Sequence, residues 1–213
     1  MKTTNILLAA MIALSSCSKK DDTSTPNNTS TNNTNTGGGN SITINSSHQV
    51  WMKIDGNVYS KIVDGNNIEN SVGASKSINL PNPTTAVYQS FFDNPNTSEG
   101  YFGVEKGTLT FSGSVADSAT FHSFYTTGSL SYSPSAFNGI RITYFDSTGD
   151  IWSTDFGSSD QTGSAFNITD IRTFNIFDYT VVIRATFNCK VYNLTGGVKT
   201  LTEGVFVGSF ASI

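Results

Sequence analysis

The chain has few cysteines and few histidines, and each shortage excludes a class of protein. Cys17 and Cys189 are the only cysteines among 213 residues, so no disulfide framework can hold the fold. His48 and His122 are the only histidines, and together with Cys189 they show no zinc-ligand spacing. We therefore expect no metal ion and no cofactor, and a fold that rests on its apolar core.

Charge is also scarce. Charged side chains make up 13% of the chain, against about 25% in ordinary soluble domains. The formal net charge is −4, and no basic cluster exists beyond Lys19-Lys20. Nucleic-acid binding needs several clustered basic side chains on the phosphates. We expect no nucleic-acid partner.

The residues of hydrolytic catalysis are equally hard to find. The Gly-x-Ser-x-Gly elbow is absent, and His122 beside Ser123 means little, because adjacent positions of a helix do not face each other. A glycosidase needs two carboxylates in one cleft. Asp155 and Glu203 are the acids most clearly placed on strand-like runs, and a charge on an edge strand explains both more simply. We predict that the protein is not an enzyme.

The N-terminus has the layout of a secretory signal. Lys2 supplies a positive charge, residues 6–14 form a nine-residue apolar run, and small residues precede Cys17. A helix needs about 20 apolar residues to span a bilayer, so this run is too short to do so.

Two short motifs in this region resemble those of bacterial lipoproteins. Leu14-Ser15-Ser16-Cys17 resembles the signal after which the cysteine is acylated and becomes the first mature residue. Lys19-Lys20-Asp21-Asp22 is similar to the export signal of Bacteroidota lipoproteins. The resemblance implies a signal peptide over residues 1–16, lipidation of Cys17, and a membrane partner through that anchor. It also implies an outer-membrane, cell-surface location.

Residues 23–40 contain Thr, Ser, Asn, Gly and one Pro, with no charge and no large apolar side chain. Such a segment cannot bury itself, so residues 17–40 are predicted to be the acylated cysteine followed by a disordered linker. Residues 41–213 then form one β-rich domain.

Short runs of β-branched and aromatic residues fill that domain, broken by turn formers every 8–12 residues or so. The strongest run, residues 180–192, alternates apolar and polar side chains throughout. Residues 198–210 are predicted to return beside it, with a bulge near Gly204 where the apolar parity switches. We expect an all-β fold, a single antiparallel barrel or sandwich, with a calycin-like barrel as one form.

The remaining elements are predicted from the same alternation and from turn signals. One short helix should begin with Asp117 or Ser118 as its N-cap. Hairpins are expected around Asp55-Gly56 and around residues 146–150. Weaker strands are expected at Ser77–Leu80, Val87–Phe92, Tyr101–Glu105, Thr108–Phe111 and Ala165–Ile171.

Three further segments resemble a family of small β-rich Bacteroidota lipoproteins with a domain of unknown function. They are residues 53–59 (Lys-Ile-Asp-Gly-Asn-Val-Tyr), residues 139–143 (Gly-Ile-Arg-Ile-Thr) and residues 200–206 (Thr-Leu-Thr-Glu-Gly-Val-Phe). The resemblance implies localisation and β-architecture, and no site residue. In addition, Asp117-Ser118-Ala119 and Asp146-Ser147-Thr148 match the Bacteroidota O-glycosylation pattern, so Ser118 and Ser147 are candidate acceptors.

Aromatic side chains are the remaining functional signal. A flat ring can cover the apolar side of a pyranose, although most aromatics in such a body pack in the core. The candidates for ligand stacking are Trp51, Trp152, Tyr101, Tyr132 and Tyr144. The leading hypothesis is a non-catalytic surface lipoprotein that binds a glycan or small ligand. The alternative is a structural or assembly lipoprotein that binds another envelope protein, and a hydrolase is the third.

We predict that Cys17→Ala abolishes labelling of the protein with palmitate, because the acylated sulfur is removed. The measurement is metabolic labelling of cells, followed by fractionation. A labelled Cys17→Ala variant in the membrane fraction would contradict the lipoprotein assignment.

Overall fold

The structure is a computed structural model that describes residues 42–64, 67–78, 80–94, 97–133, 138–174 and 179–213. Cys17, the signal peptide over 1–16 and the linker lie outside the described residues and remain predictions. Within the described part, the fold is almost entirely antiparallel β with one short helix, as predicted.

The strands follow one another along the chain and nearly all are separated by turns or loops. The elements are β1 (Gln49–Ile54), β2 (Asn57–Ile62), β3 (Glu69–Ser77), β4 (Thr84–Asn94), β5 (Thr97–Phe111), α1 (Ser118–Phe124), β6 (Gly128–Leu130), β7 (Gly139–Phe145), β8 (Ile151–Ser153), β9 (Ala165–Thr173), β10 (Thr180–Tyr192) and β11 (Val198–Ala211).

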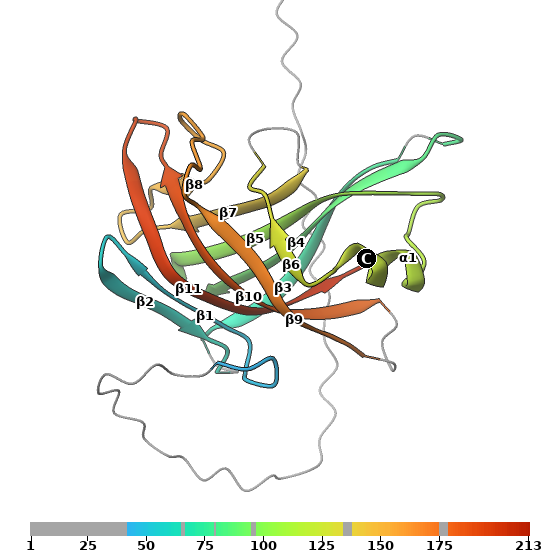
Figure 1. The fold of residues 1–213 in the computed structure, drawn as a ribbon, viewed down its shortest axis with the longest axis horizontal. Coiled ribbons are helices and arrows are strands. Elements are labelled where there is room, and N and C mark those ends of the chain that lie inside the picture. The colour runs from blue at the N-terminus through green and yellow to red at the C-terminus, as the bar shows by residue number, and fades with distance from the viewer. Residues whose placement is uncertain (1–41, 65–66, 79, 95–96, 134–137, 175–178) are drawn as a thin grey trace, which may run out of the picture. The chain divides into compact units, whose positions relative to one another are not determined.

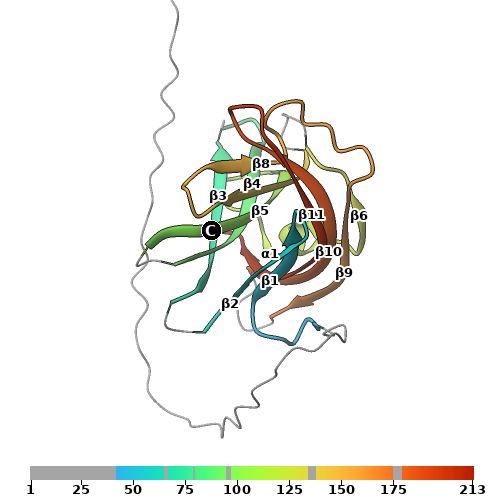
Figure 2. The same cartoon turned by 90° about the vertical axis from the view of Figure 1, so that its left-hand side faces the viewer.

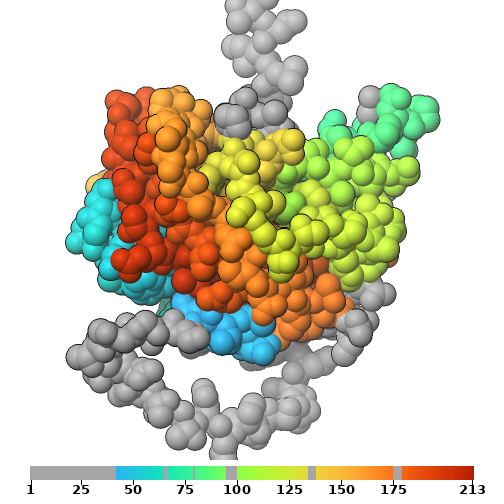
Figure 3. All heavy atoms as spheres, viewed as in Figure 1, coloured from blue at the N-terminus to red at the C-terminus, as the bar shows by residue number. Residues whose placement is uncertain are grey.

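These strands belong to one sheet, with the path β2-β1-β11-β10-β8-β7-β5-β4-β3, and β9 and β6 branch from β10. The sheet curls into a half-barrel, which the two ribbon views show from directions 90° apart (Figure 1, Figure 2). In the space-filling view, side chains of β9, β10, β11 and the α1 region form a continuous outer surface (Figure 3). Both a barrel and a sandwich were compatible with the sequence. The structure shows a single curled sheet.

The β10–β11 pair is the longest ladder, and it carries the predicted bulge. Phe187 pairs with Gly204 and Cys189 with Leu201, so one residue of β10 faces two residues of β11 at this point. A Cβ atom on Gly204 would lie 2.5 Å from the Phe187 ring. Glycine is therefore required where the ring crosses the bulge.

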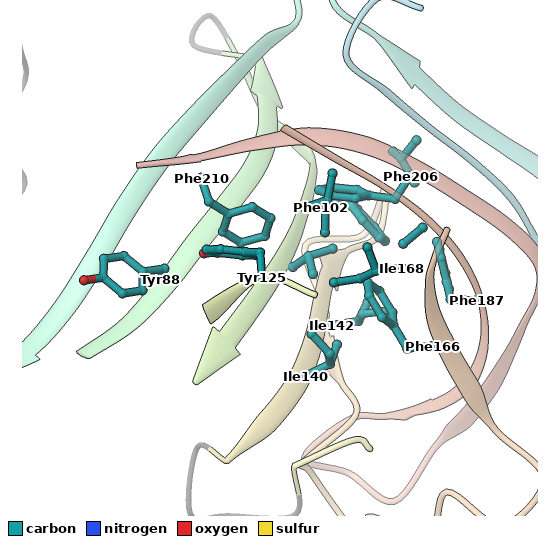
Figure 4. Close-up of a cluster of buried hydrophobic side chains, with 14 of the residues drawn as sticks. Tyr88, Phe102, Tyr125, Ile140, Ile142, Phe166, Ile168, Phe187, Phe206 and Phe210 are labelled. Atoms are coloured by element: carbon teal, nitrogen blue, oxygen red, sulfur yellow. The ribbon is translucent and has the colours of Figure 1, made fainter. Parts of the chain in front are cut away.

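The inner face of the half-barrel is packed with aromatic and branched side chains. Figure 4 shows part of this cluster, to which β1, β4, β5, β7, β8, β9, β10, β11 and α1 contribute side chains. Each fully buried side chain of this kind stabilises the fold by roughly 1.5–3 kcal/mol. The core includes Tyr88, Phe102, Tyr125, Ile140, Ile142, Phe166, Ile168, Phe187, Phe206 and Phe210.

Helix α1 is capped as the sequence predicts. Asp117 is the N-cap, and its carboxylate accepts a hydrogen bond from Thr120 N at 2.9 Å. Phe121 is fully buried and packs edge-on against Tyr88, with 4.9 Å between ring centroids. The helix therefore packs against the inner face of β4.

Two strand predictions need correction. The prediction of a strand at Ser77–Leu80 is wrong, because the strand in this region, β3, begins at Glu69 and ends at Ser77. Its polar residues are held by distant partners: Asn70 donates to Ser90 Oγ at 3.0 Å and accepts from Ser209 N at 2.9 Å. The runs expected as two strands at 101–105 and 108–111 are one continuous strand, β5.

Cys189 reports which face of β10 points into the core. Its side chain is 2% exposed, and burial raises the pKa of its thiol to about 12. We predict slow reaction with a thiol reagent in the native protein and fast reaction in urea, measured on the Cys17→Ala variant. Cys189→Ala should cost less than about 1 kcal/mol and Cys189→Asp about 3 kcal/mol, because a charge would be buried. Rapid native labelling would contradict this orientation.

Candidate functional site

The outward side chains of β4, β5 and β7 form ordered rows across three neighbouring strands. Gln89 lies opposite Glu105, and Glu105 lies opposite Arg141. We call the outward set on these strands the outer ladder. It comprises Gln89, Phe91, Tyr101, Gly103, Glu105, Arg141, Thr143 and Phe145.

The aromatic half of the outer ladder is built around a glycine. Tyr101 stacks on Phe91, with 5.6 Å between centroids and 29° between ring planes, and it lies 4.8 Å from Phe145 at 34°. A Cβ atom on Gly103 would lie 2.4 Å from the Tyr101 hydroxyl oxygen. The missing side chain therefore lets the Tyr101 ring lie against the sheet, and the three rings make a half-buried platform.

The polar half of the outer ladder is fixed by ion pairs. Arg141 pairs with Glu105 and also with Asp155, where the Nη1–Oδ2 distance is 3.0 Å. Gln89 donates from Nε2 to Glu105 Oε1 at 3.0 Å, and Ser153 donates to Asp155. These bonds hold the side chains in one geometry before any ligand arrives, which lowers the entropic cost of binding.

Burial and charge set the protonation of this site. Burial raises the pKa of Glu105, and the guanidinium of Arg141 opposes that rise. Burial also raises the pKa of Tyr101 to about 12, with the Glu105 charge adding to the effect. The Tyr101 hydroxyl is therefore protonated at neutral pH and can donate a hydrogen bond.

A groove continues from the polar half of the outer ladder. Its volume is about 470 Å³, within the range of small-molecule sites. Gln89, Glu105 and Arg141 form one wall, and small side chains such as Ser75 and Thr85 line the remainder. The rings, the polar row and the groove thus form one continuous outer surface.

The structure disperses the five aromatics predicted from the sequence. Tyr101 lies in the outer ladder. Tyr144 and Trp152 face each other on β7 and β8 and are 3% and 6% exposed. Tyr132 is half-buried, and its hydroxyl shares its one proton between the carbonyls of Ala165 and Asn188, at 3.2 and 3.1 Å; Trp51 is half-buried on β1.

Of the other candidate residues that the structure describes, only Asp155 lies beside the outer ladder, through its ion pair with Arg141. Ser118 is the first residue of α1 and is half-buried, and Ser147 is exposed in the turn after β7. Glu203 forms an ion pair with Lys53 at 2.6 Å, whereas Asp155 joins Arg141. Across the described ranges, no group of three or more His, Cys, Asp or Glu residues is placed to hold a metal ion.

Sequence reasoning did not find Phe91, Phe145, Gln89, Glu105 and Arg141 as site residues. The alternation along residues 85–93 and 139–145 puts four of them on the outward side of their strands, and Glu105 follows from its pairing with Gln89 and Arg141. That signal does not say that β4 and β7 both pair with β5, which is what brings these side chains together.

Comparison with protein-family models, with curated proteins and with solved structures found no significant match. In the part of the chain that the structure describes, no helix has the length and apolar character needed to cross a bilayer.

We predict that Arg141→Met lowers the free energy of unfolding by about 3 kcal/mol, because Glu105 would be left buried without its cation. The measurement is urea unfolding at neutral pH. Lys190→Met is the matched control: it breaks an ion pair with Asp160 that solvent screens, since the two side chains are 35% and 50% exposed, so the loss should be far smaller. Equal losses in the two variants would contradict the role given to Arg141.

Proposed function

We propose that the protein is a non-catalytic binding module whose outer ladder binds a glycan. The observation that carries this proposal is the Tyr101 ring lying over Gly103 beside a fixed row of amide, carboxylate and guanidinium groups. An aromatic face covers the apolar side of a sugar ring, and the polar row hydrogen-bonds the hydroxyls. The groove beyond the row gives room for a further sugar unit.

The charge of the site favours a neutral glycan. Glu105 and Asp155 together carry two negative charges, which the positive charges of Arg141 and of Lys76 in the groove balance. The site thus offers an acidic sugar no net positive charge, and the chain as a whole carries a formal charge of −4. Hexoses without a carboxylate or sulfate are therefore the expected ligand class.

The same ion pairs argue against hydrolysis as the main activity. A glycosidase needs one carboxyl group that gives up its proton and a second that acts separately. Glu105 and Asp155 are instead bound to the same guanidinium, so neither carboxyl group is free to act separately. Binding of a glycan, in contrast, requires only that these polar groups be held in place to hydrogen-bond the sugar hydroxyls.

The proposed setting is the cell surface of a Bacteroidota-like bacterium. Lipidation at Cys17 would anchor the chain in the outer membrane, and the polar segment over residues 23–40 would separate the domain from it. Support comes from the lipoprotein-like motifs and from the β-rich domain that follows.

One observation favours the alternative, an assembly lipoprotein that binds another envelope protein. Strand β2 ends the sheet path, and it carries Val58 and Ile62, which are 63% and 50% exposed. An edge strand with apolar side chains can pair with a strand of a second protein.

We predict that a glycan array identifies a neutral oligosaccharide and that Tyr101→Ala weakens its binding roughly tenfold in calorimetry. Gly103→Val should also weaken glycan binding. The tyrosine is retained in this variant, but the new side chain displaces the Tyr101 ring. Tyr179→Ala removes a 49% exposed tyrosine outside the outer ladder and serves as the control, with unchanged affinity.

The proposal fails if the variants bind the glycan as well as the unaltered protein does. It also fails if no glycan binds and an envelope protein is instead captured through β2, which Val58→Lys should then prevent.

A further inference from the structure

The inner face of β4 and β5 carries a second cluster of polar groups, on the opposite side of the sheet from the outer ladder. Tyr88 and Lys106 are directly opposite each other on the two strands. The segment around α1 covers them: Phe124 lies 6.2 Å from Tyr88, and Tyr125 lies 5.2 Å from Phe124, between ring centroids. Figure 4 shows Tyr88 and Tyr125 at one end of the buried cluster.

Lys106 is a buried cation without a carboxylate partner. The residue is 7% exposed, and no ion pair joins it to an acidic group among the described residues. Its Nζ atom lies 3.3 Å from the Phe124 ring centroid and 5.5 Å from that of Tyr125. Ring contacts of this kind offset only part of the cost of removing an ammonium from water.

The two phenols beside Lys106 also lack partners. The hydroxyl oxygens of Tyr88 and Tyr125 are buried and make no hydrogen bond within the part of the chain described. Burial raises the pKa of Tyr88 and the neighbouring Ser212 hydroxyl opposes that rise, while Ser212 donates its own proton to the Ala116 carbonyl at 3.3 Å. Buried hydroxyls without a partner are uncommon, and they indicate a site for a water or a ligand.

We propose that Lys106, Tyr88 and Tyr125 bind the carboxylate group of a small organic acid with an apolar body. One ammonium supplies the countercharge, and two phenols supply the donors that carboxylate oxygens accept. The rings of Phe121 and Phe124 offer apolar contact to the remainder of the acid. A doubly charged phosphate fits less well, because the site holds a single cation.

This site and the outer ladder can be tested separately, because they lie on opposite faces of the same strands. The three groups also cost free energy of folding when nothing is bound, since the rings offset only part of the desolvation of Lys106 and the two phenol hydroxyls make no hydrogen bond within the described chain. Lys106→Met, Tyr88→Phe and Tyr125→Phe should therefore leave the protein folded, with a melting temperature no lower than before.

The experiment is calorimetric titration of the full chain with benzoate and with hexanoate, and with benzyl alcohol as the uncharged control. Both acids should bind, and benzyl alcohol should bind at least about tenfold more weakly. Lys106→Met should weaken benzoate binding roughly tenfold, and each Tyr→Phe variant roughly threefold. Lys190→Met is the matched control, because Lys190 pairs with Asp160 away from this cluster and its loss should leave the affinity unchanged.

A pH series gives a second readout. Burial lowers the pKa of Lys106 to about 8, so benzoate should bind less well above that pH, as the ammonium loses its proton. The other titratable groups on the elements packed here are Tyr88, Tyr125, His122 and, on β3, Lys76; burial raises the pKa of both phenols and lowers that of Lys76. The neighbour on β7, Ile140, is apolar.

Benzoate binding that survives Lys106→Met, or that is matched by benzyl alcohol, would overturn the proposal. Tighter binding of inorganic phosphate than of benzoate would overturn the ligand class. The absence of binding by any acid at millimolar concentration, with the pKa of Lys106 unchanged in the presence of benzoate, would show that waters alone occupy the site.

Discussion

The pairing of β5 with β4 on one side and with β7 on the other determines what both faces of this protein present. In this register Tyr88 is opposite Lys106 on the inner face, and Gln89 is opposite Glu105 on the outer face. A slip of one residue would exchange the two sets, putting Glu105 into the core and Lys106 into water. The burial of Tyr88 and of Phe102, both fully inaccessible, opposes such a slip.

The two faces treat charge in opposite ways. Outside, Arg141 is bound by Glu105 and Asp155, so its position is fixed and its charge is more than compensated. Inside, Lys106 has aromatic rings around it and no carboxylate from the described chain. The outer site thus offers a rigid surface for an uncharged ligand, whereas the inner site offers a charge that an anion can neutralise.

The elements with a strong local pattern were predicted well from the sequence. Strand β10 has the predicted bounds because its apolar alternation continues over the whole strand, and Asp117 caps α1 as its side chain allows. Strand β3 was missed because its polar residues are stabilised by partners far along the chain, as Asn70 is by Ser209. Local propensity carries no information about such partners.

The candidate site was less predictable than the fold, for a related reason. Tyr101 was selected as an aromatic residue, but its neighbours depend on which strands flank β5. The β5–β7 pairing spans α1 and β6, so no hairpin turn signals it. The role of Gly103 is visible only once the Tyr101 ring is seen to lie over it.

The most direct test of the account is a map of backbone amide chemical shifts during titration with a neutral oligosaccharide. The account predicts the largest changes at Tyr101, Gly103 and Arg141, with smaller changes along the groove beside Gln89. Changes confined to the outer face of β9, β10 and β11, or to the β2 edge, would contradict it.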